Sequence, residues 1–296
     1  MSAPSHGNLR GIVAMIASQA SFIVNDALIK LATRELPGGE AILIRGVMAF
    51  VMTLVTAAAL GLLGPWPARQ DWPRIGARNI GEIGSTFFYL FALFNMPMAD
   101  ATAILQFLPL SIMGGAALFL GEPVGWRRWT AALVGFAGVL IVIQPGTAGF
   151  TAWSLLALAG VVFSTLRDLS TRGISTRYPT LLLVVFSAAT VTVAASSFAL
   201  FETWVWPTPK SLLLLAGAAV FLIGGYYFIV DAMRHGEVAV VAPFRYSVIL
   251  FAVIAGIVLF GEWPDATALA GSIIVCGAGL YTFLRERALK RMKGGS

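Results

Sequence analysis

Charged and polar residues inside long apolar segments are the feature of this sequence that could do chemistry. Glu82, Thr86 and Tyr89 are spaced i, i+4 and i+7, so they share one face of a helix. Thr102 and Gln106 repeat the i, i+4 spacing. An ionisable group at bilayer depth costs at least ~2.5 kcal/mol on insertion scales, so it is a candidate for substrate binding or ion pairing. The candidates for ion pairs or gates are Asp26, Arg45, Arg167, Asp168 and Arg245.

Residues for a metal centre or a familiar catalytic motif are scarce. The single cysteine, Cys276, excludes an internal disulfide and a cysteine metal cluster, and His6 and His235 lie far apart in the sequence. There is no HExxH, GxSxG or P-loop, and Gly277-Ala278-Gly279 lacks the third glycine and preceding strand of a dinucleotide fingerprint. We therefore expect no catalytic residue, no metal and no cofactor, and the sequence does not favour an enzyme.

The composition indicates that most of the chain faces lipid. Hydrophobic residues make up 58% of the 296 residues and charged residues 11%, and the mean hydropathy is +0.85. A soluble domain usually carries about 25% charged residues. The net charge of +6 does not indicate a nucleic-acid partner, because the basic residues lie between apolar runs.

Ten apolar segments follow one another, each close to the ~20 residues that a spanning helix needs. We predict an all-α integral membrane protein with ten transmembrane helices. The predicted helices are Gly11–Leu31, Ala41–Leu63, Ile75–Phe94, Ala99–Leu120, Trp126–Ile143, Trp153–Leu169, Leu181–Phe201, Leu212–Val230, Val238–Phe260 and Ala266–Leu284. All eight tryptophans lie at or near predicted helix ends, as in an interfacial belt.

Basic residues alternate between the two sides of this helix pattern. With the N-terminus in the cytoplasm, fourteen lysines and arginines fall on the cytoplasmic side, and only Lys30, Arg34 and Lys210 fall on the other. The positive-inside rule then predicts cytoplasmic N- and C-termini. We expect a multi-pass protein of the bacterial inner membrane.

The two halves of the sequence echo each other. Asp26, Lys30 and Pro37 recur as Asp168, Arg172 and Pro179 at an offset of 142 residues, and Leu120-Gly121-Glu122-Pro123 is echoed by Phe260-Gly261-Glu262. We predict a first five-helix repeat over 8–146, a second over 150–287 and a basic tail over 288–296. An odd number of crossings inverts the second repeat, an architecture typical of secondary transporters.

These stretches resemble the drug/metabolite transporter superfamily, in its ten-helix form built from two EamA-type units. The resemblance includes Asn25-Asp26 through Lys30, Arg45, Ala92-Leu93 through Pro109, and Ala242-Pro243-Phe244-Arg245-Tyr246. One departure is that no proline precedes Glu262 as Pro109 precedes Glu122, so the ninth helix is expected to break nearer its start, at Pro243. The resemblance implies metabolite transport, often amino-acid export, although members also handle nucleotide sugars, S-adenosylmethionine and drugs.

We predict an alternating-access carrier with a central cavity. Polar groups would hold the charged ends of the substrate, and aromatic groups its apolar part. The predicted lining is Gln19, Phe22, Glu82, Tyr89, Gln106, Phe163, Tyr227 and Tyr246, and the predicted helix breaks are Pro109, Gly224, Gly225 and Pro243. Structural roles stay open for all of these. Asp26 and Asp168 would pair with Lys30 or Arg172 or cap a chain end, Glu82 would pair with an arginine of a neighbouring helix, and the tyrosines would serve packing.

The favoured function is export of an amino acid or an amphipathic metabolite. One alternative is import of a larger metabolite such as S-adenosylmethionine, and a second is a membrane-embedded enzyme or lipid-modification subunit. Proton coupling through Glu82 is an open option. The small-residue stripes Ala131/Gly135/Gly138 and Ser272/Cys276/Gly279 serve either close packing within the chain or a homodimer.

Overall fold

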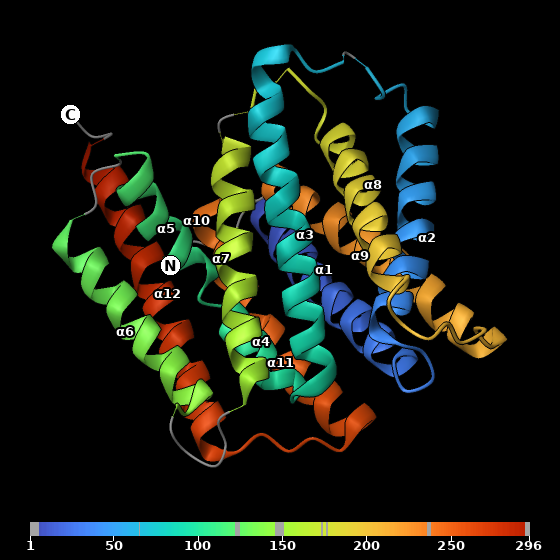
Figure 1. Cartoon of the computed structure of the whole chain (residues 1–296). Helices are drawn as coiled ribbons and strands as arrows, with labels where there is room; N and C mark the ends of the chain where they lie inside the picture. Colours follow the sequence, from blue (N-terminus) through green and yellow to red (C-terminus); the bar gives the residue numbers. More distant parts are fainter. Residues whose placement is uncertain are drawn as a thin grey trace. The chain divides into compact units, whose positions relative to one another are not determined.

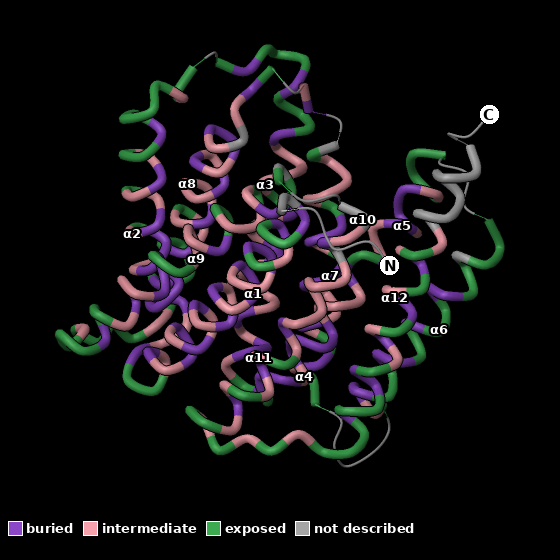
Figure 2. The backbone as a smooth tube through the Cα atoms, turned by 180° about the vertical axis from the view of Figure 1, so that it is seen from behind, coloured by how far each residue is buried: buried purple, intermediate pink, exposed green. Residues whose placement is uncertain are grey.

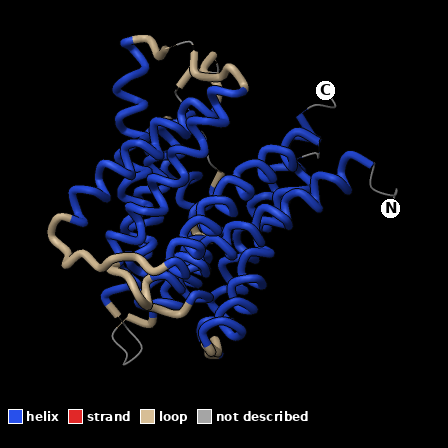
Figure 3. Tube along the Cα trace, turned by 90° about the vertical axis from the view of Figure 1, so that its right-hand side faces the viewer, coloured by secondary structure: helices blue, strands red, loops and turns tan. Residues whose placement is uncertain are grey.

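The part of the chain that the structure describes is helical, with loops and no strand (Figure 3). This computed structural model describes residues 6–64, 66–121, 125–145, 151–172, 174–175, 177–235 and 238–293. Glu122 and Pro123, part of the repeated landmark, and residues 294–296 of the predicted basic tail lie outside the described residues. An all-helical fold is what lipid requires, because a helix satisfies its backbone polar groups internally.

The helices follow the ten predicted segments in order (Figure 1). The first half contains α1 (His6–Ala32), α2 (Gly38–Ala59), the short η1 (Arg69–Asp71), α3 (Trp72–Asn95), α4 (Met98–Leu105), α5 (Leu108–Phe119) and α6 (Trp126–Ile143). The second half contains α7 (Ala152–Arg172), α8 (Thr180–Ala199), α9 (Pro209–His235), α10 (Val238–Val241), η2 (Ala242–Tyr246), α11 (Ser247–Ala255), η3 (Gly256–Phe260) and α12 (Ala266–Lys293).

In the described part of the chain, eight helical stretches are long and apolar enough to cross a membrane, and Trp129–Ile143 in α6 is a shorter apolar helix. The remaining long helix, α3, carries Arg74, Arg78 and Glu82 in its first three turns and is therefore more polar. Ten helical segments, five in each half of the sequence, confirm the prediction of an all-α integral membrane protein.

Helix ends differ from the predictions where local chemistry decides them. The second helix was expected to reach Leu63 but ends at Ala59, because Gly61 adopts a positive φ of 65°. Leu62 then donates its backbone N–H to the carbonyl of Ala57 at 2.8 Å, as in a Schellman cap. At the other end of the chain, α12 continues past Leu284 to Lys293, so much of the predicted basic tail prolongs this helix.

Two of the ten segments are interrupted, and a third is not. The fourth segment stops at Leu105 and resumes at Leu108, with Pro109 in the first turn of α5. The ninth is divided into α10, the 3-10 turn η2 that contains Pro243, α11 and the π-helical turn η3. By contrast, α9 is continuous through Gly224 and Gly225, so the helix break expected there does not occur.

The chain divides into two compact units, each built from both halves of the sequence. Unit 1 comprises residues 1–23, 96–155 and 224–296, and unit 2 comprises residues 24–95 and 156–223. In unit 1, α6 packs along α12, and in unit 2, α2 packs along α8. Along α2, buried and exposed residues alternate (Figure 2), as expected for a helix with one packed face and one open face.

Candidate functional site

Asp26 lies in a hydrogen-bonded network inside unit 2. Its carboxylate accepts hydrogen bonds from the hydroxyl of Tyr89 at 2.8 Å and from the amide of Asn25 at 2.8 Å. The Asn25 carbonyl oxygen in turn accepts from Nη1 of Arg45 at 3.1 Å. Asn25 and Arg45 are buried, with 3% and 7% of their surface exposed. Helices α1, α2 and α3 therefore converge on one polar network, with Tyr89 and Asn25 as partners of Asp26 where the sequence suggested Lys30.

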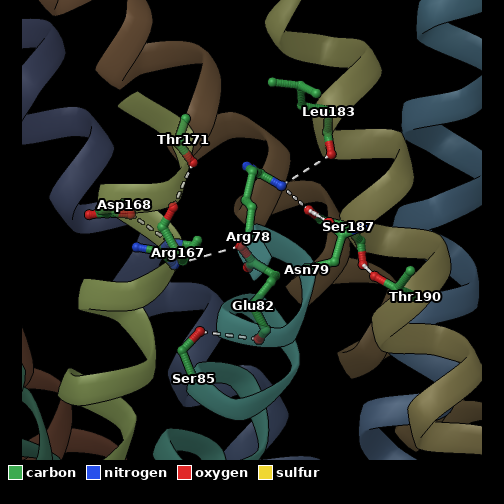
Figure 4. A network of polar contacts seen from close by, with 10 residues as sticks. All are labelled: Arg78, Asn79, Glu82, Ser85, Arg167, Asp168, Thr171, Leu183, Ser187 and Thr190. Atoms are coloured by element: carbon green, nitrogen blue, oxygen red, sulfur yellow. Dashed lines mark hydrogen bonds and ion pairs between the residues drawn. The ribbon is translucent and has the colours of Figure 1, made fainter. Parts of the chain in front are cut away.

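A second network joins α3 to α7 through Glu82 (Figure 4). Nη1 of Arg167 lies 3.7 Å from the Glu82 carboxylate, and Nε of Arg167 donates to Asp168 at 2.7 Å. Asp168 thus pairs with its neighbour in the chain, and the side chain of Arg172 is not described. Three predicted residues form one ion-pair cluster here.

Glycines place the two helices of this cluster close together. A Cβ atom on Gly81 would lie 2.6 Å from the backbone nitrogen of Arg167, and one on Gly84 would lie 2.3 Å from the ring of Phe163. Phe163 also contacts Phe88, with ring centroids 5.2 Å apart. This glycine pair was not predicted as a site, although glycines on either side of Glu82 are a sign of close helix packing.

A third group of polar residues, which sequence reasoning did not single out, connects α3 to α8. Nη1 of Arg78 donates to the carbonyl of Leu183 at 3.3 Å and to the hydroxyl of Ser187 (Figure 4). The Ser187 hydroxyl donates to Asn79 at 3.0 Å. Arg78 lies one helical turn before Glu82, and the i, i+4 spacing was the available signal.

Carboxylates close the end of unit 2 where α2 begins. Glu202 accepts from the backbone N–H groups of Gly39 and Glu40, both at 3.1 Å, and Glu40 accepts from the N–H of Val205 at 3.0 Å. Such bonds satisfy free amides at a helix N-terminus.

Nearby, Glu35 is held by Lys210 at 2.7 Å and by the hydroxyls of Ser211 and Thr208 at 2.6 and 2.9 Å. These hydrogen bonds, that from Lys210 first, lower the pKa of Glu35 to about 2. The loop after α1 is therefore tied to the start of α9 by a carboxylate that stays ionised at neutral pH.

In unit 1, glycines of α9 receive the side chains of α1. The ring of Phe22 would lie 2.7 Å from a Cβ on Gly225, and it meets Tyr226 edge-on at 5.4 Å. The hydroxyl of Ser18 donates to the Gly225 carbonyl at 2.8 Å. Gly225 thus allows the two helices to approach closely and supplies a hydrogen-bond acceptor without breaking the helix.

The buried Gln19 donates to the sulfur of Met15 at 3.5 Å.

The remaining predicted lining residues of unit 1 have separate surroundings. The hydroxyl of Tyr246 packs against Gly279, where a Cβ would lie 1.6 Å away, so this tyrosine packs against α12. Tyr227 is 65% exposed. Gln106 stands at the end of α4, and Arg245 is half-buried on η2.

Gly138 of the first small-residue stripe packs against Gly271 of α12, which lies outside the second predicted stripe, whereas Gly279 of the second stripe packs against Tyr246. Added Cβ atoms on Gly138 and Gly271 would lie 3.0 Å and 2.6 Å from the carbonyl oxygen of the other glycine. These glycines thus serve close packing inside the chain, one of the two expected roles of the stripes.

The repeated Leu/Phe-Gly-Glu landmark has a structural reason. Gly121 and Gly261 both have left-handed backbones, with φ of 67° and 68°, and each follows the end of a helix. Glu262 then accepts from the backbone N–H of Met98, at the start of α4, at 2.8 Å. The glycine thus ends a helix in both copies, and in the second copy the glutamate also caps another helix.

The structure divides the predicted residues between the two units. Unit 2 contains Asp26, Arg45, Glu82, Tyr89, Phe163, Arg167 and Asp168, and unit 1 contains Gln19, Phe22, Gln106, Tyr227, Arg245 and Tyr246. Among the described residues, no group of three histidine, cysteine, aspartate or glutamate side chains is placed to hold a metal ion.

Comparison with known proteins gives matches over nearly the whole chain. The model of the EamA-like transporter family matches twice, at residues 9–144 and 151–284. The chain is 27% identical to a pseudopaline exporter of Pseudomonas aeruginosa over 288 residues, 96% of this chain and 97% of that one. It is 24% identical to an S-adenosylmethionine uptake transporter of Rickettsia prowazekii (94% of each chain) and 26% identical to a riboflavin transporter of Vibrio cholerae (91% of each).

A solved structure, titled only as the crystal structure of a protein, has a similar fold. Its TM-score is 0.64 and its sequence identity 21%, with coverage of 97% of this chain and 99% of the other. At that identity the similarity concerns the fold alone.

Proposed function

Because this chain belongs to the EamA-like transporter family, whose model matches it twice, we propose that it is a secondary transporter of the alternating-access type that exports a zwitterionic or amphipathic metabolite of amino-acid size. The full-length relatives named above are all transporters. A small-molecule substrate and a multi-pass position in the membrane follow from the family.

Charges of both signs within the helices of unit 2 are the observation that carries this proposal. Asp26 and Arg45 lie in one hydrogen-bonded network, and Glu82 and Arg167 form an ion pair 3.7 Å apart. Buried ionisable groups in spanning helices are costly and are typical of substrate or ion pathways. A zwitterion offers one partner for each sign of charge, whereas a phosphate would need a cluster of basic groups.

Aromatic rings stand next to these charges. Phe163 of α7 packs over Gly84, two residues after Glu82, and its ring contacts Phe88. Ligand sites commonly combine an apolar lining with a few fixed polar groups. This neighbourhood supports a cargo with an apolar side chain.

The direction of transport rests on relatives. The pseudopaline exporter matches this chain over almost its full length and supports export. Import of a larger metabolite is the second candidate, since a protein named as an S-adenosylmethionine uptake transporter matches over 94% of both chains.

Transport by the purified protein in liposomes tests the proposal. Proteoliposomes loaded with radiolabelled leucine, phenylalanine or methionine should release them faster than protein-free liposomes. S-adenosylmethionine, riboflavin and a nucleoside serve as competing cargoes. Robust movement of a nucleoside or a phosphorylated sugar, with no movement of any amino acid, would overturn the proposal.

Three further features belong to the same proposal. Glu82 exchanges a proton as substrate binds, so that Glu82→Gln uncouples transport from a pH gradient more than it weakens binding. Both termini lie in the cytoplasm and the protein resides in the inner membrane, as the charge distribution of the loops favours. A homodimer would form through outward residues of α6 and α12 such as Leu133 and Ile273, which are 66% and 71% exposed.

The orientation has a direct test. An impermeant thiol reagent applied to intact cells should leave a cysteine at Ser296 unlabelled and should label one placed at Lys210. The opposite labelling pattern would contradict cytoplasmic termini.

A further inference from the structure

Arg78 is a charged side chain to which the described part of unit 2 offers only uncharged partners. Its Nη1 donates to the carbonyl of Leu183 and the hydroxyl of Ser187. Its Nε is enclosed and has no acceptor among the described residues. Arg167, on the neighbouring helix, differs in having carboxylates at 2.7 and 3.7 Å.

The partners of Arg78 hold it in a fixed orientation. The Ser187 hydroxyl, which is buried, gives its proton to Asn79 at 3.0 Å, so its lone pairs face the guanidinium. Nη1 is thereby anchored to α8, while Nη2 makes no bond within the described part of the chain. Figure 4 shows the bonds that Arg78 makes to Leu183 and Ser187. The other edge of the guanidinium is the one that a ligand would bind.

A partly enclosed guanidinium without a counter-ion among the described residues is unfavourable, and an arginine fork pairs well with a carboxylate. No described carboxylate takes this place at Arg78, and an anion from outside the chain would complete the pairing. We infer that Arg78 binds the carboxylate of the transported metabolite; this inference rests on the proposed function and names a binding residue for it.

Glu82 provides the opposite charge on the same helix. Arg78 and Glu82 are spaced i, i+4, so their Cβ atoms lie about 5–6 Å apart on one face of α3. The ammonium group of the cargo replaces Arg167 at Glu82, and Arg167 keeps Asp168 at 2.7 Å. One turn of α3 thereby presents an arginine and a carboxylate to the two charged ends of an amino acid.

Lipid phosphate is another source of an anion at this position. Arg78 lies six residues beyond Trp72, which corresponds to about 9 Å along the helix. Trp72 packs with Trp66 and Phe186, an aromatic group typical of the membrane interface. The anchoring of Arg78 to Leu183 and Ser187 of α8 favours the cargo over a lipid headgroup.

Matched ligands test the inference on the full-length protein. Binding of leucine, phenylalanine and methionine is compared with binding of isoamylamine, phenethylamine and 3-methylthiopropylamine, which lack only the carboxylate. The wild type should prefer the best-bound amino acid over its amine by about 10- to 100-fold, the range expected for a hydrogen-bonded charge pair. In Arg78→Gln the ratio should fall to about one, and in the control Arg177→Gln, which alters an exposed arginine, it should be unchanged.

If Arg78→Gln does not fold, the ratio in the wild type and in Arg78→Lys decides the matter. A wild type that binds amine and amino acid equally well, or an Arg78→Gln protein that retains the full preference, overturns the inference while leaving amino-acid transport intact. Transport of a nucleoside or riboflavin, with no binding of any amino acid, overturns the proposed function as well. Phosphatidylglycerol could also stabilise the protein against heat, with Arg78→Gln alone losing this stabilisation. If the preference for amino acid over amine is then unchanged, Arg78 binds a lipid headgroup, and its role in cargo binding is overturned.

Discussion

Replacement of Gly81 by alanine should loosen the contact between α3 and α7 that supports the Glu82–Arg167 ion pair. The new Cβ would lie 2.6 Å from the backbone nitrogen of Arg167 and 2.8 Å from its Cα and from the carbonyl oxygen of Phe163. All three are backbone atoms, so no side chain can rotate away. Ordinary contact starts near 3.4 Å, and the helices must therefore separate by the difference, about 0.8 Å.

The expected destabilisation follows from two opposing effects. Overpacking of a closed contact costs about 1–3 kcal/mol, with the upper part of this range appropriate where backbone must move. Alanine gains about 1 kcal/mol over glycine in a helix. We therefore expect Gly81→Ala to lower the free energy of unfolding by about 1–2 kcal/mol.

Gly76 on the same helix is the matched control, because a Cβ there would have no atom within 4 Å. Heat unfolding in detergent should show a midpoint a few degrees lower for Gly81→Ala and an unchanged or higher midpoint for Gly76→Ala. Transport should fall in Gly81→Ala alone. Equal stability of the two variants would refute the reasoning that the α3–α7 contact is closed at backbone level.

Three other predictions follow from described contacts. Gly279→Ala should lower the unfolding midpoint because its Cβ meets the hydroxyl of Tyr246, whereas Gly277→Ala, with open space around it, should not; a second Tyr246→Phe change should restore part of the loss. Glu35 has a pKa lowered to about 2, so its bonds stabilise the fold fully above its ordinary pKa of 4.5 and are lost as the pH falls toward 2; Glu35→Gln should flatten this part of the acid-unfolding profile. Tyr89→Phe removes a hydrogen bond to the Asp26 carboxylate, and bonds of this kind contribute about 1.5–3 kcal/mol. Transport rates should fall without loss of expression. Unchanged rates would show that this hydroxyl has no role in transport.

The helical segments were predictable because hydrophobic length is the main requirement for crossing lipid. The ten segments, the breaks at Pro109 and Pro243, and the charged positions could all be read from residue type alone. The end of α2 was misplaced because Gly61 lies inside an apolar run that gives no sign of a stop. The absence of a break in α9 has the same origin, since Gly224 and Gly225 are equally suited to a kink and to close packing.

The partners of each charge were harder to predict than its position. Asp26 was expected to bond to Lys30, four residues away, but the fold brings Tyr89 from α3 to it. Arg78 is one of the fourteen basic residues assigned to the cytoplasmic side, and its contact with Ser187 depends on the packing of α3 against α8. Pairings between distant segments require the tertiary structure, which neither periodicity nor spacing supplies.

Each compact unit contains helices from both halves of the chain, and this has a consequence for biosynthesis. α2 is made about 120 residues before α8, and α6 about 120 residues before α12. The early helices therefore enter the membrane with their glycine-lined faces uncovered, and they must remain competent for packing until translation is nearly complete. A ribosome that stops after the first repeat should release two sets of helices without partners, which cellular quality control would treat as unfinished protein.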